Sequence, residues 1–423
     1  MSRTVQFALF FGFILTLFGL MQWYLVASYR KWVRSAWPDR EKAFLRPMWY
    51  IVGIGSILLL MSFLARRVGL SEHPELRYLI VYPSGLYFAM VILGFFSLAI
   101  KDLVSLLAAI PSFVRRLSGF LLRREQPLAA PVAEIDKGRR TFLRLAGSGT
   151  IGAIAATPLL TSLATARDYQ VRRIPMYFPN LPSELEGLTI AQISDIHSGV
   201  YMSANDMNTI FEIVNSLHPT ITTVTGDLVD TNDTEIPPLH SALKTLKADR
   251  GVYAVLGNHD HFATGDKVAA AVSDAGLTVM RNAHETLSID GANLSLIGID
   301  DCSPRRNFAD LERAVDGLDE ESFKVMLVHQ PRFWEEAKSA NMDLTLVGHT
   351  HGGQVGVEAF GMKLYPVYLA YDHPMGHYIE DGKQLYVNVG VGMVGTPIRL
   401  VRPEIALFEL HQGEPRKYAP ESI

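Results

Sequence analysis

Side chains that can bind metal ions recur in five groups between residues 195 and 351, and each group follows a short apolar run. These candidate metal ligands are Asp195, His197, Asp227, Asn258, His329, His349 and His351. A single histidine or aspartate in a chain of 423 residues is more often a surface or structural group than a ligand. Five groups in fixed order, each directly after an apolar run, are hard to obtain by chance. The spacing therefore predicts one shared metal site.

The donor atoms of these side chains indicate which ions would bind. Carboxylate oxygens, one amide oxygen and imidazole nitrogens, with no thiolate, suit manganese, iron or zinc better than calcium or magnesium. Asp227 is the candidate for a position between two ions, because one carboxylate can hold metals about 3.5–4 Å apart. A water between two such ions loses a proton near neutral pH and can attack phosphorus in line. The sequence thus predicts a phosphohydrolase with two divalent ions as cofactors, manganese before iron or zinc.

Two residues directly after Asn258 are candidate catalytic residues. His259 is placed to protonate the leaving oxygen, and Asp260 to hold the imidazole in the required tautomer. The alternative for His259 is a histidine that supports the ligands without touching the substrate. We predict that both His259 and Asp260 are catalytic.

The elements that would position these side chains show alternating strand-like and helix-like apolar patterns. Strands are expected at 188–193, 221–225, 252–256, 294–299, 324–328, 344–347 and 385–389, and helices at 204–217, 238–247, 267–275 and 333–340. This alternation predicts an α/β domain over residues 167–423. The candidate ligands follow the carboxyl ends of strands, where open α/β sheets place their sites.

The motifs around these residues resemble the calcineurin-like metallophosphoesterase superfamily over roughly residues 187–410. The resemblance rests on GLTIAQISDIH at 187–197, GHTHGGQ at 348–354, and PIR through PEI at 397–405. These motifs are most similar to the membrane-associated branch, which includes transmembrane proteins with a metallophosphoesterase domain and hydrolases of the UDP-2,3-diacylglucosamine pyrophosphatase type. The resemblance implies a two-sheet β sandwich flanked by helices.

The resemblance also implies a division of the ligands. One ion would be held by Asp195, His197, Asp227 and His351, and the other by Asp227, Asn258, His329 and His349. It gives the acid role to His259. The Gln at position 330, after the ligand His329, departs from the Asn or Glu that relatives often carry there.

The N-terminal third has the character of a membrane domain. Uncharged apolar runs long enough to cross a bilayer occupy residues 6–27, 47–65 and 79–100, and a weaker one occupies 145–166. We expect three transmembrane helices within residues 1–110, a basic cytoplasmic linker at 111–144, and a fourth transmembrane helix or a twin-arginine-like signal at 145–166.

The distribution of charge predicts the orientation. Residues 28–46 carry six basic side chains and residues 101–144 carry nine, which places both segments in the cytoplasm. Four spans then put the domain from residue 167 on the non-cytoplasmic face of the cytoplasmic membrane. Arg66, Arg67 and Arg77 would lie outside, against the rule, and loss of the fourth span would leave the domain in the cytoplasm.

The segment GRRTFLR at 138–144 resembles a twin-arginine export signal, and Ala164-Thr165-Ala166 resembles a small-residue cleavage site. The other interpretation is a basic flank of an ordinary membrane helix, and both remain open. The first would make the twin-arginine export machinery a partner.

Several classes of protein are excluded or disfavoured by composition. With 48% hydrophobic and 19% charged residues the chain is neither disordered nor fibrous. The basic residues cluster between apolar runs, so no nucleic acid is expected as a partner. Cys302 is the single cysteine and makes no intrachain disulfide.

The prediction is a membrane-anchored metallophosphoesterase that cleaves a phosphoester or pyrophosphate bond of a lipid-linked substrate. An anchored nucleotide or general phosphodiesterase is one alternative. A metal-binding sensor or scaffold is another, from a different class.

Overall fold

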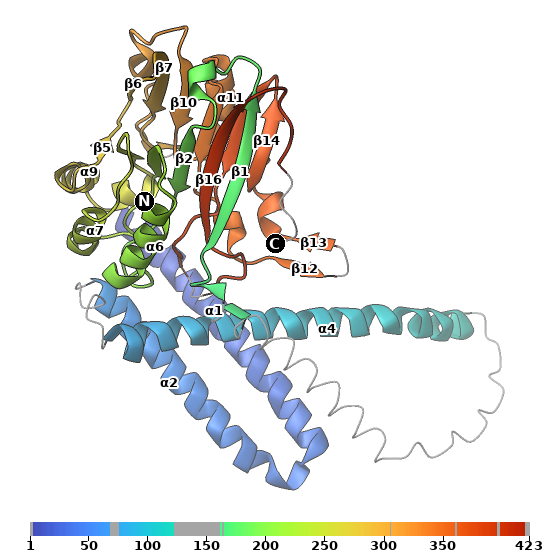
Figure 1. Cartoon of the computed structure of the whole chain (residues 1–423). Coiled ribbons are helices and arrows are strands. Elements are labelled where there is room, and N and C mark those ends of the chain that lie inside the picture. Colours follow the sequence, from blue (N-terminus) through green and yellow to red (C-terminus); the bar gives the residue numbers. More distant parts are fainter. Residues whose placement is uncertain are drawn as a thin grey trace. The chain divides into compact units, whose positions relative to one another are not determined.

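The computed structural model describes residues 3–67, 76–121, 161–162, 165–304, 306–359, 362–395 and 398–418. They belong to two compact units, one formed by the N-terminal helices and the other by the chain from Thr161 onward together with residues 76–77. Figure 1 shows the long helices of the first unit and the strands of the second. Each unit is described by itself.

The N-terminal unit consists of apolar helices. They are α1 (Arg3–Ala36), the short η1 (Pro38–Arg40), α2 (Glu41–Arg67), the π-helical η3 (Arg77–Val81) and α4 (Tyr82–Leu121). Three stretches are long and apolar enough to cross a membrane: Gly12–Ala36, Pro38–Ala65 and Leu79–Pro111. Gln22 of α1 joins the three long helices, because its amide donates to the Ser56 hydroxyl at 3.1 Å and to the Tyr87 hydroxyl at 2.9 Å.

The three expected apolar helices are therefore present. Helix α4 continues to Leu121, past residue 110, where we expected the membrane domain to end. Residues 122–160, which hold most of the expected linker and of the expected fourth span, lie outside the described part of the chain.

The second unit contains two six-stranded mixed sheets (Figure 1). The first has the order β1 (Gln170–Phe178), β16 (Glu404–Gln412), β2 (Thr189–Ile193), β3 (Ile221–Thr225), β4 (Val252–Val255), β5 (Thr278–Val279). The second has the order β14 (Gly376–Glu380), β15 (Lys383–Val387), β11 (Leu344–Val347), β10 (Phe323–Leu327), β7 (Ala292–Gly298), β6 (Ala283–Ile289). Strands β2, β3 and β4 are parallel, as are β7, β10, β11 and β15.

The sheets pack face to face because alternate residues of each strand point to opposite sides. Ile190 of β2 and Val325 of β10 lie in one buried cluster between the sheets. Ala191 belongs to a second cluster under the outer helices of the first sheet, and Met326 to a third behind the second sheet. The expected two-sheet sandwich flanked by helices is confirmed.

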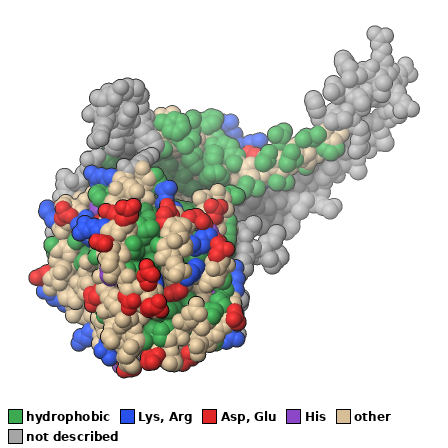
Figure 2. Space-filling view, turned by 90° about the horizontal axis from the view of Figure 1, so that it is seen from above, with side chains coloured by type: hydrophobic (Ala, Val, Ile, Leu, Met, Phe, Trp, Pro, Cys, Tyr) green, Lys and Arg blue, Asp and Glu red, His purple; other side chains and the backbone are tan. Residues whose placement is uncertain are grey.

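Helices cover the outer faces of both sheets. They are α6 (Ala204–Ser216), α7 (Ile236–Leu243) and α9 (Gly265–Asp274) beside the first sheet, and α10 (Leu311–Val315) and α11 (Trp334–Ser339) beside the second. Short elements complete the unit: η4 (Ser183–Leu185), η5 (Asp233–Glu235), α8 (Asn258–Phe262), β8 (Cys302–Ser303), β9 (Arg306–Asn307), η6 (Pro331–Phe333), η7 (His351–Gly353), β12 (Val357–Ala359), β13 (Met362–Leu364) and η8 (Pro366–Leu369). On the face in Figure 2, acidic and basic side chains are interspersed.

Candidate metal centre and active site

The candidate ligands lie in loops that leave the carboxyl ends of strands from both sheets. Asp195 and His197 follow β2, Asp227 follows β3, and Asn258 begins α8 after β4. In the second sheet His329 follows β10, and the pair at 349 and 351 follows β11. The structure brings loops from both sheets together at one end of the sandwich.

The backbone of this region is held in an uncommon conformation. Five of the seven candidate ligands have left-handed φ angles between 49° and 73°: Asp195, His197, Asp227, His349 and His351. Non-glycine residues adopt this conformation at a cost of about 1–3 kcal/mol each, and they cluster at functional sites. The strained backbone at these five residues sets the direction in which their side chains leave the loops.

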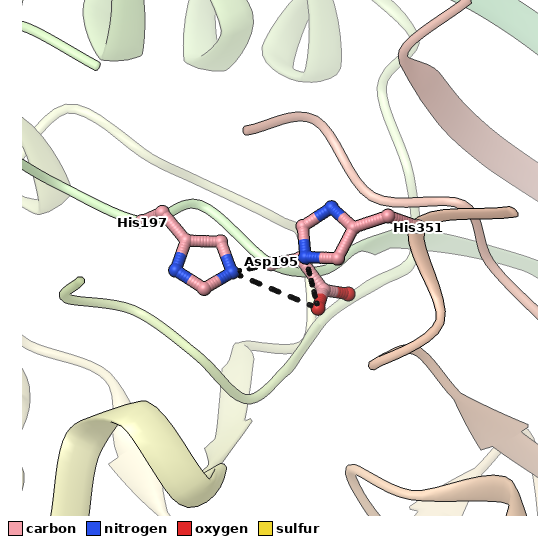
Figure 3. A group of neighbouring side chains, drawn as sticks. All are labelled: Asp195, His197 and His351. Atoms are coloured by element: carbon pink, nitrogen blue, oxygen red, sulfur yellow. Dashed lines mark hydrogen bonds and ion pairs between the residues drawn. The ribbon is translucent and has the colours of Figure 1, made fainter. Parts of the chain in front are cut away.

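One group of donor atoms is formed by Asp195, His197 and His351 (Figure 3). His351 Nε2 lies 3.3 Å from Asp195 Oδ1 and 3.1 Å from His197 Nε2. All three side chains are buried, with at most 6% of the side chain exposed. Three buried ligand atoms that lie within 4.8 Å of one another can bind one ion.

A second group is formed by Asp227, His329 and His349. His329 Nε2 lies 3.0 Å from Asp227 Oδ2 and 3.2 Å from His349 Nδ1. The same Asp227 Oδ2 lies 3.7 Å from His197 Nε2, a member of the first group. Asp227 therefore stands between the two groups, as a carboxylate shared by two ions would.

The donors in these groups fit divalent cations. Asn258 Oδ1 is buried and accepts no hydrogen bond among the described residues, although an unpaired buried oxygen costs free energy. The next residue, His259, donates its backbone N–H to Asp227 Oδ1 at 2.8 Å. Within each of the two groups, the nitrogen and oxygen atoms that could bind an ion lie within 4.8 Å of one another. The residues present match an oxygen and nitrogen ligand set.

The charges of the site are strongly coupled. Although burial alone would lower it, the Asp227 carboxylate raises the pKa of His329 to about 10. Burial and the adjacent His329 charge lower the pKa of His349 to about 3. Burial opposes ionisation of Asp227, yet the His329 charge holds the pKa of that carboxyl well below its usual range. Without an ion, Asp227 is therefore ionised, His349 is neutral and His329 carries a proton. A bound cation would have to displace the His329 proton, because metals bind the neutral imidazole.

His259 lies beside the first group, at the start of α8. Its ring stands 4.6 Å from the His197 ring, between centroids, and is partly exposed. His259 Nδ1 contacts the backbone carbonyl of Asp230 and lies 3.6 Å from Asp230 Oδ1. Because a carbonyl only accepts, Nδ1 carries a proton and Nε2 is left for the substrate.

The role predicted for Asp260 is corrected by this geometry. Asp260 is fully buried, and its carboxylate accepts from the backbone N–H groups of Leu228 at 2.8 Å, Val229 at 3.0 Å and Gly257 at 2.8 Å. It ties together the loops after β3 and β4 and does not contact the His259 ring. Asp230 takes the place beside His259, and the signal for it was a second carboxylate three residues after Asp227.

A pocket of about 370 Å³ adjoins the second group. It is lined by Pro304, Gln330, Pro331, Arg332, His349, Ala370, Tyr371, Asp372 and His373. The Tyr371 hydroxyl lies 3.2 Å from His349 Nε2, so it orients the ring whose Nδ1 faces His329. Tyr371 was not among the predicted site residues, because nothing in its neighbourhood marks it in the sequence.

Other basic residues near the motifs have structural partners. His373 binds Glu380 Oε1 at 2.7 Å, and His377 binds Gln384 Oε1 at 2.8 Å. Arg402 pairs with Asp168 at 2.8 Å, and the Arg399 side chain is fully buried. None of these four presents a free charge to the pocket.

Comparison with known proteins assigns the region that contains these residues to a family. The sequence profile of the calcineurin-like phosphoesterase family matches residues 188–353, which contain all seven candidate ligands. An uncharacterized metallophosphoesterase of Bacillus subtilis is 33% identical over 287 residues, which cover 64% of this chain and 97% of that protein.

Two further relatives are matched over a smaller share of their length. An uncharacterized metallophosphoesterase of Helicobacter pylori is 31% identical, over 57% of this chain and 64% of that protein. The bovine transmembrane protein with metallophosphoesterase domain is 27% identical, over 64% of this chain and 62% of that protein. The chain thus spans under two thirds of these two relatives but nearly all of the Bacillus protein. With that coverage and the family profile over the site, the chain belongs to the calcineurin-like metallophosphoesterases, a family of phosphoester hydrolases.

Proposed function

We propose that this protein is a membrane-anchored phosphohydrolase that uses two divalent ions, manganese before iron or zinc, to cleave a phosphoester or pyrophosphate bond of a lipid-linked substrate. The observation that carries the proposal is the position of Asp227 Oδ2, 3.0 Å from His329 Nε2 and 3.7 Å from His197 Nε2. One carboxylate within reach of two ligand groups supports a dinuclear site. When bound, two such ions acidify a water and neutralise phosphate oxygens.

The side chains around the ions would perform the remaining steps. Asp195 with its two histidines would hold one ion, and Asn258, His329 and His349 would hold the other, with Asp227 shared. His259 would give a proton from Nε2 to the leaving oxygen while Asp230 holds Nδ1.

The lipid-linked substrate is supported by the apolar residues exposed near the site. Among the described residues from 165 onward, four large apolar side chains are exposed: Phe262, Phe308, Tyr368 and Leu369. The Phe262 ring lies 4.9 Å from that of His259, and Tyr368 and Leu369 directly precede the pocket residues Ala370 and Tyr371. Leu369 is 93% exposed, which costs free energy in water unless an apolar partner covers it. Acyl chains next to a phosphorylated headgroup would supply that partner.

The test is an assay of the full chain, purified in detergent with manganese, on a lipid extract and on a panel of nucleotides. Hydrolysis of a compound in the lipid fraction, followed by mass spectrometry as loss of the parent lipid and gain of its phosphomonoester or alcohol product, supports the proposal. Hydrolysis of nucleotides alone favours the anchored nucleotide phosphodiesterase. Metal binding without hydrolysis of either, or of bis-p-nitrophenyl phosphate, favours the sensor.

Two variants sharpen the assay. We expect Asp227→Asn to lower kcat/KM at least a thousandfold and to reduce the bound metal below two ions per chain, because it removes the shared charge. Asp233→Asn is the matched control, since this partly exposed carboxylate pairs with Lys267 at 2.7 Å and accepts from Thr264, neither of which is a candidate ligand. Undiminished activity in Asp227→Asn would show that the shared-carboxylate assignment is wrong.

A further inference from the structure

The chain that leads into β1 is fastened to the loop that follows β15. The Arg399 backbone N–H donates to Ser162 Oγ at 2.6 Å, and the Thr165 hydroxyl donates to the Arg399 carbonyl. Further along, the Gln170 N–H donates to the Pro403 carbonyl at 2.8 Å. Ser162 is only 1% exposed, so its contact is part of the interior of this unit. Ser162, Thr165 and Gln170 are thus each attached to the loop between β15 and β16.

Arg399 also fastens the inner side of that loop. Its guanidinium is fully buried and donates to the carbonyls of Val389 at 2.8 Å, Gly390 at 2.7 Å and Val401 at 2.9 Å, and also to that of Gly392. A buried guanidinium is costly, and a lysine could not satisfy four carbonyls in this fork. The side chain therefore fixes the path of the loop.

The same loop forms the wall behind the first ligand group. The Gly392 N–H donates to the Asp195 carbonyl at 2.8 Å, and the Val391 N–H donates to the Ser194 carbonyl at 2.9 Å. Arg399 Nη1 itself lies 3.5 Å from His351 Nδ1. Contacts thus run without interruption from Ser162 through Arg399 to the backbone of Asp195 and the ring of His351.

We propose that Arg399 is a positioning residue for the Asp195–His197–His351 half of the metal centre, and that the segment through Ser162 and Thr165 is its permanent outer support. This inference goes beyond the proposed function, because it assigns a role to residues that touch neither substrate nor metal. Its consequence concerns processing of the chain. Cleavage after Ala166 would remove both hydroxyls, so the segment is retained in the mature protein.

The positioning role is tested by manganese titration of the full chain in detergent, with bound metal counted and the spectrum of paired ions followed by electron paramagnetic resonance. We expect Arg399→Lys to weaken one of the two ions at least tenfold and to abolish the spin-coupled signal, while the other ion stays bound. Two ions with unchanged affinity in Arg399→Lys would overturn the proposal. Arg402→Lys is the matched control and should behave as the wild type.

A milder variant covers the case in which Arg399→Lys does not fold. Ser162→Ala combined with Thr165→Val removes the two hydroxyls that contact the Arg399 backbone and also the Thr165 contact to the Thr161 carbonyl at 3.0 Å, but it leaves the Arg399 side chain in place. We expect about three- to tenfold weaker binding of one ion. Thr161→Ser, at an exposed position, is its control. Unchanged affinity in the double variant would overturn the outer-support role. A wild type that binds no metal would instead refute the proposed function.

Retention of the segment has a readout that does not depend on metal. Mass spectrometry of the protein isolated from membranes should detect peptides that contain Ser162 and Thr165, joined to residue 167. An N-terminus at Arg167 in the mature protein would refute retention.

Discussion

At the scale of single residues, the contacts of His259, Asp230 and Asp260 predict which substitutions affect catalysis and which affect stability. His259 and Asp230 contact each other beside the ligands, whereas Asp260 accepts three backbone N–H groups. We expect His259→Asn to lower kcat about a hundred- to ten-thousandfold, the usual contribution of a general acid, with little change in thermal stability. Kinetics of the purified variants on bis-p-nitrophenyl phosphate measure this.

The companion variants distinguish the two carboxylates. Asp230→Asn should also lower kcat, because the His259 ring loses the charge beside it. Asp260→Asn should destabilise the fold by about 1–3 kcal/mol, since backbone donors are left poorly paired. A larger kcat effect in Asp260→Asn than in Asp230→Asn, at equal folding, would restore the original assignment.

A buried ion-pair network makes stability depend on pH. Burial alone would raise the pKa of Asp300, but hydrogen bonds from His261 at 2.7 Å and Arg281 at 2.7 Å lower this pKa. A depressed carboxyl pKa stabilises the fold above the unfolded value near 4, and the contribution is lost as pH falls through the folded pKa. We expect Asp300→Asn to cost about 1–3 kcal/mol at pH 7 and progressively less below pH 4. Melting temperatures from pH 3 to 7 test this, and a difference that grows toward pH 3 would contradict it.

The candidate ligands could be read from the sequence because each follows its strand directly. The structure does not place Asp260 against the His259 ring, because the prediction took adjacency in sequence for adjacency in space. The first turn of α8 points Asp260 back to the loops behind it, and the group beside His259 comes from the loop after β3. Tyr371 approaches His349 from a distant loop, which no local pattern shows.

At the scale of elements, two glycines with the same backbone conformation have different surroundings. Gly390, in the loop behind the metal centre, has φ +77°, and a Cβ there would lie 2.7 Å from Asp195 Cβ. Gly382, in the β14–β15 turn, has φ +76° and open space around a Cβ. We expect Gly390→Ala to weaken manganese binding at least tenfold, and Gly382→Ala to leave it unchanged.

Because both variants carry the same strained φ, the comparison isolates the contact with Asp195. The measurement is manganese affinity together with melting temperature. Equal losses of metal affinity in the two variants would show that strain alone is responsible.

Strands β2, β3, β4, β7, β10, β11 and β15 were predicted to within two residues of their ends, since each is mostly buried and carries a short run rich in apolar and β-branched residues. Strand β1 was not, because Arg172, Arg173 and Pro175 interrupt its pattern. Arg172 is only 8% exposed and pairs with Glu404 of β16 at 2.9 Å. The ion pair with Glu404 compensates for the burial of Arg172. Because Glu404 lies more than 200 residues further along the chain, the sequence of β1 alone does not show this pairing.

At the scale of the whole molecule, the orientation of the metallophosphoesterase unit remains a prediction. Basic flanks at 28–46 and 101–144 place those segments in the cytoplasm, and four spans put the unit on the opposite face. A fused reporter after Ile423 should therefore be active outside the cytoplasm. Cytoplasmic activity would show that residues 145–166 do not span the membrane.

The pairing of β1 with β16 also bears on how the protein is made. A ribosome delivers β1 first, but its partner in the sheet is the last strand of the unit, in register from Gln170 and Glu404 onward. Until β16 has been synthesised, β1 has no neighbour in this sheet, and the edge of β2 that β16 will cover stays open. The sheet can therefore close only after residues 404–412 have left the ribosome, so a truncation shortly before residue 404 should leave a product that aggregates or is degraded.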